Sequence, residues 1–310
     1  MLLIKSDRLL ADYSMVETPI DDDAQMVSQA ATARALGLGL VPSLRPRSTA
    51  ENRVAIATLH ALGGQPIVPW DVDVGHDERG LAKRFFGRPQ DDADLDPFVR
   101  ANRDLLDRME TAVQVGLVVP VDKGQRDRIK HLVRRLTDHG VSMAFVPVGG
   151  SREYLLRADP ERLRHFSLLL LTNEEANYSP EVLRAITQSG VPHRQASDLL
   201  DQDIAKLRPF LVTPGSEGLR LIPRADPKDE QRLVVHIIDT RRGERNAESA
   251  HCARRLGIRR EQFGPGSIAS VRWATPFGRN RPQVSFKDNE MFFTLKGCPL
   301  WGVLALRMNR

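Results

Sequence analysis

Short apolar runs alternate with longer amphipathic segments over the first third of the chain. The predicted elements are helices at residues 24–36, 50–62 and 94–112 and strands at residues 38–42 and 66–70. Gly37 ends the first of these helices and Gly63-Gly64 ends the second, while Ser48-Thr49 can cap the start of the second. This succession of a strand, a helix of about a dozen residues and another strand is typical of a parallel sheet or barrel. We therefore expect residues 1–112 to form part of a (β/α) barrel.

The same rhythm restarts after residue 112. The predicted elements are strands at residues 115–121, 141–148, 166–171 and 210–213 and helices at residues 125–139 and 180–188. Gly140 ends the first helix, and Pro180 occupies the favoured first position of the second. We expect residues 113–222 to form a small, doubly wound, flavodoxin-like α/β domain.

The pattern changes again at residue 223. Short β-type runs, separated by Gly, Pro, Asn and Asp, predict strands at residues 233–238, 270–274, 283–286, 291–295 and 303–306. Residues 287–290 (Lys-Asp-Asn-Glu) suit the connection of a hairpin. The simplest arrangement of residues 223–310 is an antiparallel β-sandwich, so the chain as a whole is expected to be an α/β protein with a β-sandwich at its end.

Composition and charge exclude several classes of protein. The chain of 310 residues has room for two or three domains, and its 41% hydrophobic and 27% charged residues are ordinary for a globular protein. The net charge is only +5, arginines are interspersed with acidic residues, and aromatics are scarce, so nucleic acid is not an expected partner. The longest apolar run, Ser167–Leu171 and its neighbours, is far shorter than a membrane span.

The termini and the cysteines add little chemistry. Residues 1–8 lack a basic region leading into an apolar stretch, so they do not resemble a signal peptide, and a cytoplasmic location is expected if Met1 is the natural start. Cys252 and Cys298 make neither a disulfide framework nor a metal cluster, and buried free thiols are favoured over a pair. No metal site and no cofactor is expected.

Two carboxylates stand where parallel α/β folds place reactive groups, at the C-terminal ends of strands. Glu17 follows an apolar run that contains Tyr13, and Asp71 directly follows Trp70. A tryptophan ring can stack on a sugar while a neighbouring carboxylate acts as acid, base, nucleophile or hydroxyl clamp. The alternatives stay open: Glu17 and Asp71 as surface or capping carboxylates, and Trp70 as a core or interface ring.

Other catalytic patterns are missing. The chain holds no GxGxxG, no phosphate-binding P-loop, no HExxH and no GxSxG. Residues 113–222 contain no cysteine, which excludes cysteine-dependent glutaminase chemistry there. A nucleotide- or phosphate-binding α/β domain is the weakest of the functions considered.

Residues 52–71 (Asn-Arg-Val-Ala-Ile-Ala-Thr-Leu-His-Ala-Leu-Gly-Gly-Gln-Pro-Ile-Val-Pro-Trp-Asp), followed by 84–87 (Arg-Phe-Phe-Gly) and 94–102, carry a resemblance. The chain resembles the latter part of modular bacterial glycoside hydrolases, such as the family 42 β-galactosidases and related uncharacterised groups. Those enzymes have a barrel, then a glutamine-amidotransferase-like α/β domain, then a C-terminal β-sandwich. The three zones follow this order over nearly the whole chain.

The resemblance implies hydrolysis or binding of carbohydrate. It makes Glu17 the candidate nucleophile and places Trp70 and Asp71 in the sugar subsite, with Tyr13 and Asp73 as further candidate substrate contacts. A complete barrel takes about 250 residues, so residues 1–112 suggest a fragment or a truncated homologue. Two readings remain: a glycoside hydrolase with a homo-oligomeric partner or a missing N-terminal half, or a non-catalytic carbohydrate-binding or oligomerisation module.

Overall fold

The computed structural model describes most of the chain, and its elements fall into two compact units. The described residues are 13–18, 23–67, 71–107, 109–112, 114–121, 126–150, 157–208, 210–211, 218–240, 253–259, 268–287, 290–296 and 300–309. Unit 1 comprises Met1–Val16, Asp22–Leu40 and Val113–Arg208, and unit 2 comprises Glu17–Asp21, Val41–Ala112 and Pro209–Arg310. Each unit is described by itself.

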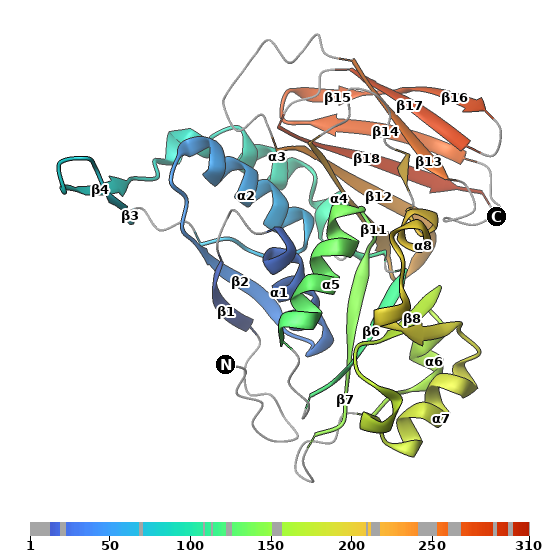
Figure 1. Cartoon of the computed structure of the whole chain (residues 1–310). Coiled ribbons are helices and arrows are strands. Elements are labelled where there is room, and N and C mark those ends of the chain that lie inside the picture. Colours follow the sequence, from blue (N-terminus) through green and yellow to red (C-terminus); the bar gives the residue numbers. More distant parts are fainter. Residues whose placement is uncertain are drawn as a thin grey trace. The chain divides into compact units, whose positions relative to one another are not determined.

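Unit 1 is built on a parallel four-stranded sheet. Its strands are β6 (Val115–Pro120), β7 (Met143–Val148), β8 (Leu168–Leu171) and β9 (His193–Gln195), in the order β7-β6-β8-β9. Its helices are α1 (Asp23–Ala35), α5 (Arg126–Asp138), α6 (Pro160–Leu163), α7 (Pro180–Ser189) and α8 (Asp201–Lys206), with 3-10 turns η2 (Glu175–Asn177) and η3 (Ala196–Asp198) (Figure 1).

Apolar cores cover both faces of this sheet. Leu168 and Leu170 of β8 enter the core that α5 shares, whereas Leu169 and Leu171 enter the core that α7 shares. A strand that is buried on both faces needs a continuous apolar sequence, which explains the run of four leucines. The predicted strands at 115–121, 141–148 and 166–171 and the predicted helices at 125–139 and 180–188 are confirmed to within two residues.

The N-terminal strands continue the alternation of strand and helix. β1 (Tyr13–Thr18) pairs with β2 (Gly39–Leu44), and α2 (Thr49–Ala61) follows β2. The Ser48 hydroxyl accepts a hydrogen bond from the Glu51 N–H at 3.2 Å, which caps α2 as the sequence predicts. Beyond α2, Ile67 forms a parallel bridge with Ser43 of β2.

The rest of the segment before residue 112 departs from the prediction of one long helix. It contains a hairpin of β3 (Val72–His76) and β4 (Ala82–Phe85), the 3-10 turn η1 (Pro89–Asp92), helices α3 (Leu95–Ala101) and α4 (Arg103–Leu106), and the short strand β5 (Glu110–Thr111). The helix is interrupted at Asn102, whose side chain donates to the Phe98 carbonyl at 2.8 Å. The backbone of Asn102 is not helical, with φ −122° and ψ 26°.

Two antiparallel sheets of unit 2 share one hydrophobic core. The six-stranded sheet has the order β15 (Gly278–Asn280), β14 (Ile268–Thr275), β18 (Trp301–Met308), β12 (Asp229–Asp239), β11 (Leu219–Asp226) and β5. The four-stranded sheet has the order β10 (Phe210–Leu211), β13 (Ala253–Arg259), β17 (Glu290–Lys296) and β16 (Gln283–Lys287). Val235, Trp273 and Leu304 of the first sheet and Leu256 and Phe293 of the second enter this core.

The strands of this region were predicted only in part. All five predicted runs after residue 223 lie in β12, β14, β16, β17 and β18, and Lys287 pairs with Glu290 across the predicted hairpin. Phe210, expected to continue the parallel α/β domain, instead pairs antiparallel with Ile258 of β13. Mixed α/β content with a parallel sheet and antiparallel sheets is thus confirmed for the described part of the chain.

Helices cover the second face of the six-stranded sheet. Arg224 of β11 donates to the Ala61 carbonyl of α2 at 3.0 Å, and Phe98 of α3 packs edge-on against Trp301 of β18, with ring centroids 4.9 Å apart. Gly63 follows α2 with φ +83°, and a Cβ there would lie 2.7 Å from a guanidinium nitrogen of Arg224. Glycine at this position thus lets the end of α2 approach the sheet closely.

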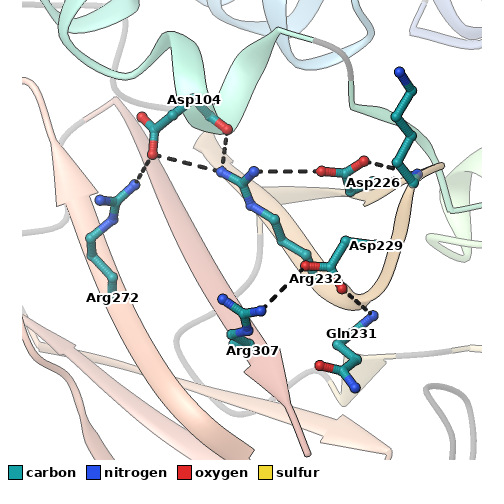
Figure 2. Close-up of polar contacts among 8 residues, drawn as sticks. Asp104, Asp226, Asp229, Gln231, Arg232, Arg272 and Arg307 are labelled. Atoms are coloured by element: carbon teal, nitrogen blue, oxygen red, sulfur yellow. Dashed lines mark hydrogen bonds and ion pairs between the residues drawn. The ribbon is translucent and has the colours of Figure 1, made fainter.

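A polar network also ties α4 to this sheet (Figure 2). Asp104 accepts a hydrogen bond from Arg272 of β14 at 2.8 Å, and both its backbone carbonyl and its carboxylate contact Arg232 of β12. Arg232 reaches Asp226 as well, at 3.5 Å. These side chains are partly exposed, so the network fixes the position of α4 more than it adds stability.

Candidate active site

Glu17 lies near the end of β1, and Asp71 lies between the bridge at Ile67 and the start of β3. Tyr13 begins β1 and Glu17 is the fifth of its six residues. Ile67, which bridges β2 in parallel, precedes Asp71 by four residues. Where strands run parallel, their C-terminal ends meet at one edge of the sheet. The backbone of Glu17 and the residue Asp71 both belong to unit 2.

Asp71 is held by an arginine that the sequence did not single out. Arg84 of β4 donates from Nε to one carboxylate oxygen of Asp71 at 2.6 Å and from Nη2 to the other at 2.8 Å. This contact raises the pKa of the Arg84 guanidinium, chiefly through the hydrogen bond. The Asp71 side chain is 32% exposed. A carboxylate held in this bidentate way has both oxygens in charge-assisted hydrogen bonds and remains partly accessible.

Asp73 stands two residues further on, in the β3–β4 hairpin. Its carboxylate accepts a hydrogen bond from the Gly75 N–H at 2.9 Å, and the residue is exposed. Figure 1 shows the hairpin extending away from α2 and α3. The side chains of Tyr13 and Glu17, and the whole of Trp70, lie outside the described residues, so their parts in the site stay predictions.

A second polar cluster, absent from the sequence predictions, lies buried between α2, α3 and the six-stranded sheet. His236 and Trp301 are both 0% exposed, and the Trp301 indole N–H donates to Nδ1 of His236 at 3.3 Å. The His60 ring of α2 stacks on Trp301 with an interplanar angle of 9° and a centroid distance of 6.0 Å. Nε2 of His236 is buried, and among the described residues nothing hydrogen-bonds to it.

The buried position of this cluster indicates a structural role rather than a catalytic one. Burial, together with the positive charge of Arg224 and with His60, holds the pKa of His236 well below its ordinary value near 6.5. Burial likewise lowers the pKa of His60. Both imidazoles are therefore neutral at pH 7, and no substrate reaches His236.

Unit 2 is expected to lose stability in mild acid. Below about pH 6.5 the two histidines take up protons in the unfolded chain, whereas in the folded chain their lowered pKa values keep them neutral. The free energy of unfolding is therefore highest above that pH and falls as the pH drops further. The slope reaches about 1.4 kcal/mol per pH unit for each histidine. Urea unfolding followed by tryptophan fluorescence at pH 7.5 and pH 5.0 measures it, since all three tryptophans belong to unit 2.

The control for this prediction is an exposed aromatic residue of the same unit. His236→Phe should flatten the pH dependence, whereas Phe277→Ala, at a side chain 63% exposed in the turn between β14 and β15, should leave it unchanged. A free energy of unfolding that is equal at the two pH values in the unaltered protein would contradict the argument.

The described residues contain no candidate metal site and no candidate membrane-spanning helix. Within the part of the chain that the structure describes, no three His, Cys, Asp or Glu side chains gather in a way that could hold a metal ion. None of the helices described is both long and apolar enough to cross a membrane.

Comparisons with known proteins find similarity in structure alone. No protein-family model matches the chain, and no curated protein matches its sequence. The structure is similar to that of alpha-L-fucosidase isoenzyme 2 from Paenibacillus thiaminolyticus, with a TM-score of 0.60 and 10% identity over 96% of this chain and 65% of the fucosidase. It is also similar to the rhamnosidase from Novosphingobium sp. PP1Y, with a TM-score of 0.54 and 10% identity over 96% of this chain and 35% of that chain.

These similarities establish a glycoside-hydrolase-related fold. The match runs over nearly the whole of this chain, so it includes the parallel and the antiparallel sheets together. The chain spans less than two thirds of the fucosidase and about a third of the rhamnosidase. At 10% sequence identity, these comparisons support a shared fold but assign no role to any individual residue of this chain.

Proposed function

We propose that this protein is a carbohydrate-active member of a glycoside hydrolase lineage, with its sugar site at the strand ends that carry Glu17 and Asp71. The observation that carries the proposal is Asp71, a partly accessible carboxylate that is ion-paired with Arg84 and lies four residues after Ile67, which bridges β2 in parallel. The fold similarity to a fucosidase and a rhamnosidase supports the same conclusion.

The proposed domain layout follows the modular arrangement of family 42 β-galactosidases. β1, α1, β2, α2 and the bridge at Ile67 represent a segment of a (β/α) barrel. Numbered along the chain from β6, the parallel strands of unit 1 have the order 2-1-3-4, which agrees with a flavodoxin-like, glutamine-amidotransferase-like domain. The two antiparallel sheets of unit 2 represent the C-terminal β-sandwich.

In the proposed mechanism, Glu17 is the nucleophile or assisting carboxylate and Asp71 is its partner at the sugar. Retaining hydrolysis places two carboxyl groups about 5 Å apart, and inversion places them further apart to admit a water molecule. Arg84 holds both oxygens of Asp71, and in this proposal the Asp71 carboxylate stabilises positive charge at the anomeric carbon or accepts hydrogen bonds from sugar hydroxyls. Trp70 supplies a stacking surface, and Tyr13 and Asp73 contact the sugar hydroxyls.

Hydrolysis of aryl glycosides tests this proposal. Release of p-nitrophenol is measured from p-nitrophenyl α-L-fucoside and p-nitrophenyl α-L-rhamnoside, the first substrates that the structural neighbours suggest. Glu17→Gln and Asp71→Asn should each lower kcat/KM by about 10²–10⁴-fold, the range typical of a lost catalytic carboxylate. Glu78→Gln, which neutralises an exposed carboxylate of the same hairpin region, should have no effect.

A second function is favoured by the ion pair itself. Because Arg84 occupies both oxygens of Asp71, the site is also suited to bind sugar without cleaving it, as in a non-catalytic carbohydrate-binding module. Calorimetric titration with L-fucose and L-rhamnose separates the two functions. Binding that Asp71→Asn abolishes, without turnover, favours the binding module; neither binding nor turnover of any glycoside tried would reject both.

A further inference from the structure

β16 forms an exposed edge of the four-stranded sheet. It is the last strand in the order β10-β13-β17-β16, and all five of its residues, Gln283–Lys287, are exposed (Figure 1). Among the strands that the structure describes, only β17 pairs with it. An exposed strand edge offers unpaired N–H and C=O groups to another strand.

This edge carries apolar side chains instead of the usual protective charges. Val284 is 37% exposed and Phe286 is 62% exposed. In register they lie opposite Phe293 and Met291 of β17, which are both buried in the core between the sheets. Directly opposed residues share a face, so Val284 and Phe286 extend the core face of the sheet beyond the region that is covered.

The hairpin register also determines which backbone groups point outward. Two residues connect Lys287 to Glu290, and in a two-residue hairpin the flanking pair exchanges hydrogen bonds. Hydrogen-bonded and non-hydrogen-bonded pairs alternate along an antiparallel ladder. Lys287, Ser285 and Gln283 therefore bond to β17, and the N–H and C=O groups of Val284 and Phe286 point to the open edge.

We propose that this edge is a dimer interface, in which β16 pairs antiparallel with β16 of a second copy around a two-fold axis at Ser285. This register sets Val284 of each copy opposite Phe286 of the other, so apolar side chains meet apolar side chains. The outward backbone groups of these two residues also meet, which gives four backbone hydrogen bonds between the copies. The strand is thus complementary to itself in both side chains and backbone.

Charge agrees with the same register. Lys287 of one copy faces the uncharged Gln283 of the other, so no like charges oppose each other within the strand. A parallel, in-register alignment of two copies would instead set Lys287 of one copy beside Lys287 of the other, so charge favours the antiparallel pairing.

Light scattering coupled to size-exclusion chromatography tests the dimer. The unaltered protein should have about twice the 34.7 kDa mass of the chain across a concentration series. The double variant Val284→Lys, Phe286→Lys opposes four like charges across the proposed axis and should be monomeric. Phe277→Lys is the matched control, because Phe277 is 63% exposed but lies in the turn between β14 and β15, and it should leave the dimer intact.

A cysteine at the axis tests the register itself. In a variant with Cys252 and Cys298 replaced by serine, Ser285→Cys sets two thiols opposite each other in a non-hydrogen-bonded pair. The Cα atoms of such a pair lie about 4.5 Å apart, within the range of a disulfide. Mild oxidation should cross-link this variant, whereas Gln283→Cys, with its two copies about 14 Å apart, should stay uncross-linked.

Either of two results overturns the proposal: a monomeric unaltered protein over the whole concentration series, or a dimer that both survives the double lysine variant and fails to cross-link through Ser285→Cys. Circular dichroism and thermal melting confirm that the variants are folded. The proposal is independent of the carbohydrate site, because β16 contains none of the residues assigned to it.

Discussion

Trp301→Ala should destabilise unit 2 by about 3–5 kcal/mol, the cost typical of truncating a fully buried tryptophan. The ring is 0% exposed and is enclosed by Phe98, His60 and His236. Its removal opens a cavity between α2, α3 and the six-stranded sheet and takes away the hydrogen bond to Nδ1 of His236. At about 2–4 °C per kcal/mol for a unit of this size, the melting temperature should fall by roughly 10 °C. Differential scanning calorimetry measures it.

Two further variants isolate the cause. Trp301→Phe keeps much of the packing but loses the indole N–H, so it should cost clearly less than the alanine variant. Phe277→Ala removes an aromatic ring that is 63% exposed and should change the melting temperature very little. If Trp301→Ala melted at the temperature of the unaltered protein, the helix layer would not depend on this ring for its attachment to the sheet.

Local chemistry made much of the fold predictable. Ser179 caps α7, Pro180 occupies its first turn, and Gly190 ends it in the left-handed conformation with φ 70°, as the sequence indicates. The four leucines of β8 predict a strand covered on both faces. In these cases the determining signal lies within a few residues of the element.

Other elements depended on distant partners. β13, Ala253–Arg259, was not predicted because it contains as many arginines as apolar residues. Its alternation nevertheless buries Leu256 and Ile258, and Arg255 lies over the Phe292 ring at 4.2 Å. The pattern of period two was a usable signal, but the aromatic partner that shelters the arginine comes from β17 and could not be inferred from β13.

The candidate site likewise contains features that are evident in the sequence and features that depend on distant partners. That Asp71 follows an apolar run is evident in the sequence, whereas its ion pair with Arg84 requires the β3–β4 hairpin to form. His236 gave no sequence signal at all, since its neighbours Trp301 and His60 come from strands and helices far along the chain.

Two of the three segments that carried the resemblance, residues 52–71 and 94–102, are joined by a buried ion pair. Arg53 of α2, with a side chain only 3% exposed, donates from its two terminal nitrogens to the two carboxylate oxygens of Asp94, at 2.6 and 2.7 Å. The same guanidinium also donates to the Asp91 carbonyl. These contacts connect the first turn of α2 with the chain entering α3.

Arg53→Met should therefore destabilise unit 2 by about 3–5 kcal/mol, because it leaves the mostly buried carboxylate of Asp94 without its countercharge. The double variant Arg53→Met, Asp94→Leu should recover much of that loss, since an apolar pair of similar volume replaces the ion pair. Arg100→Met is the matched control: its ion pair with Asp96, also on α3, is about 65% exposed and should be worth less than about 1 kcal/mol. Urea unfolding followed by tryptophan fluorescence gives all three values. A loss for Arg53→Met no greater than that for Arg100→Met would show that burial does not determine the strength of this pair.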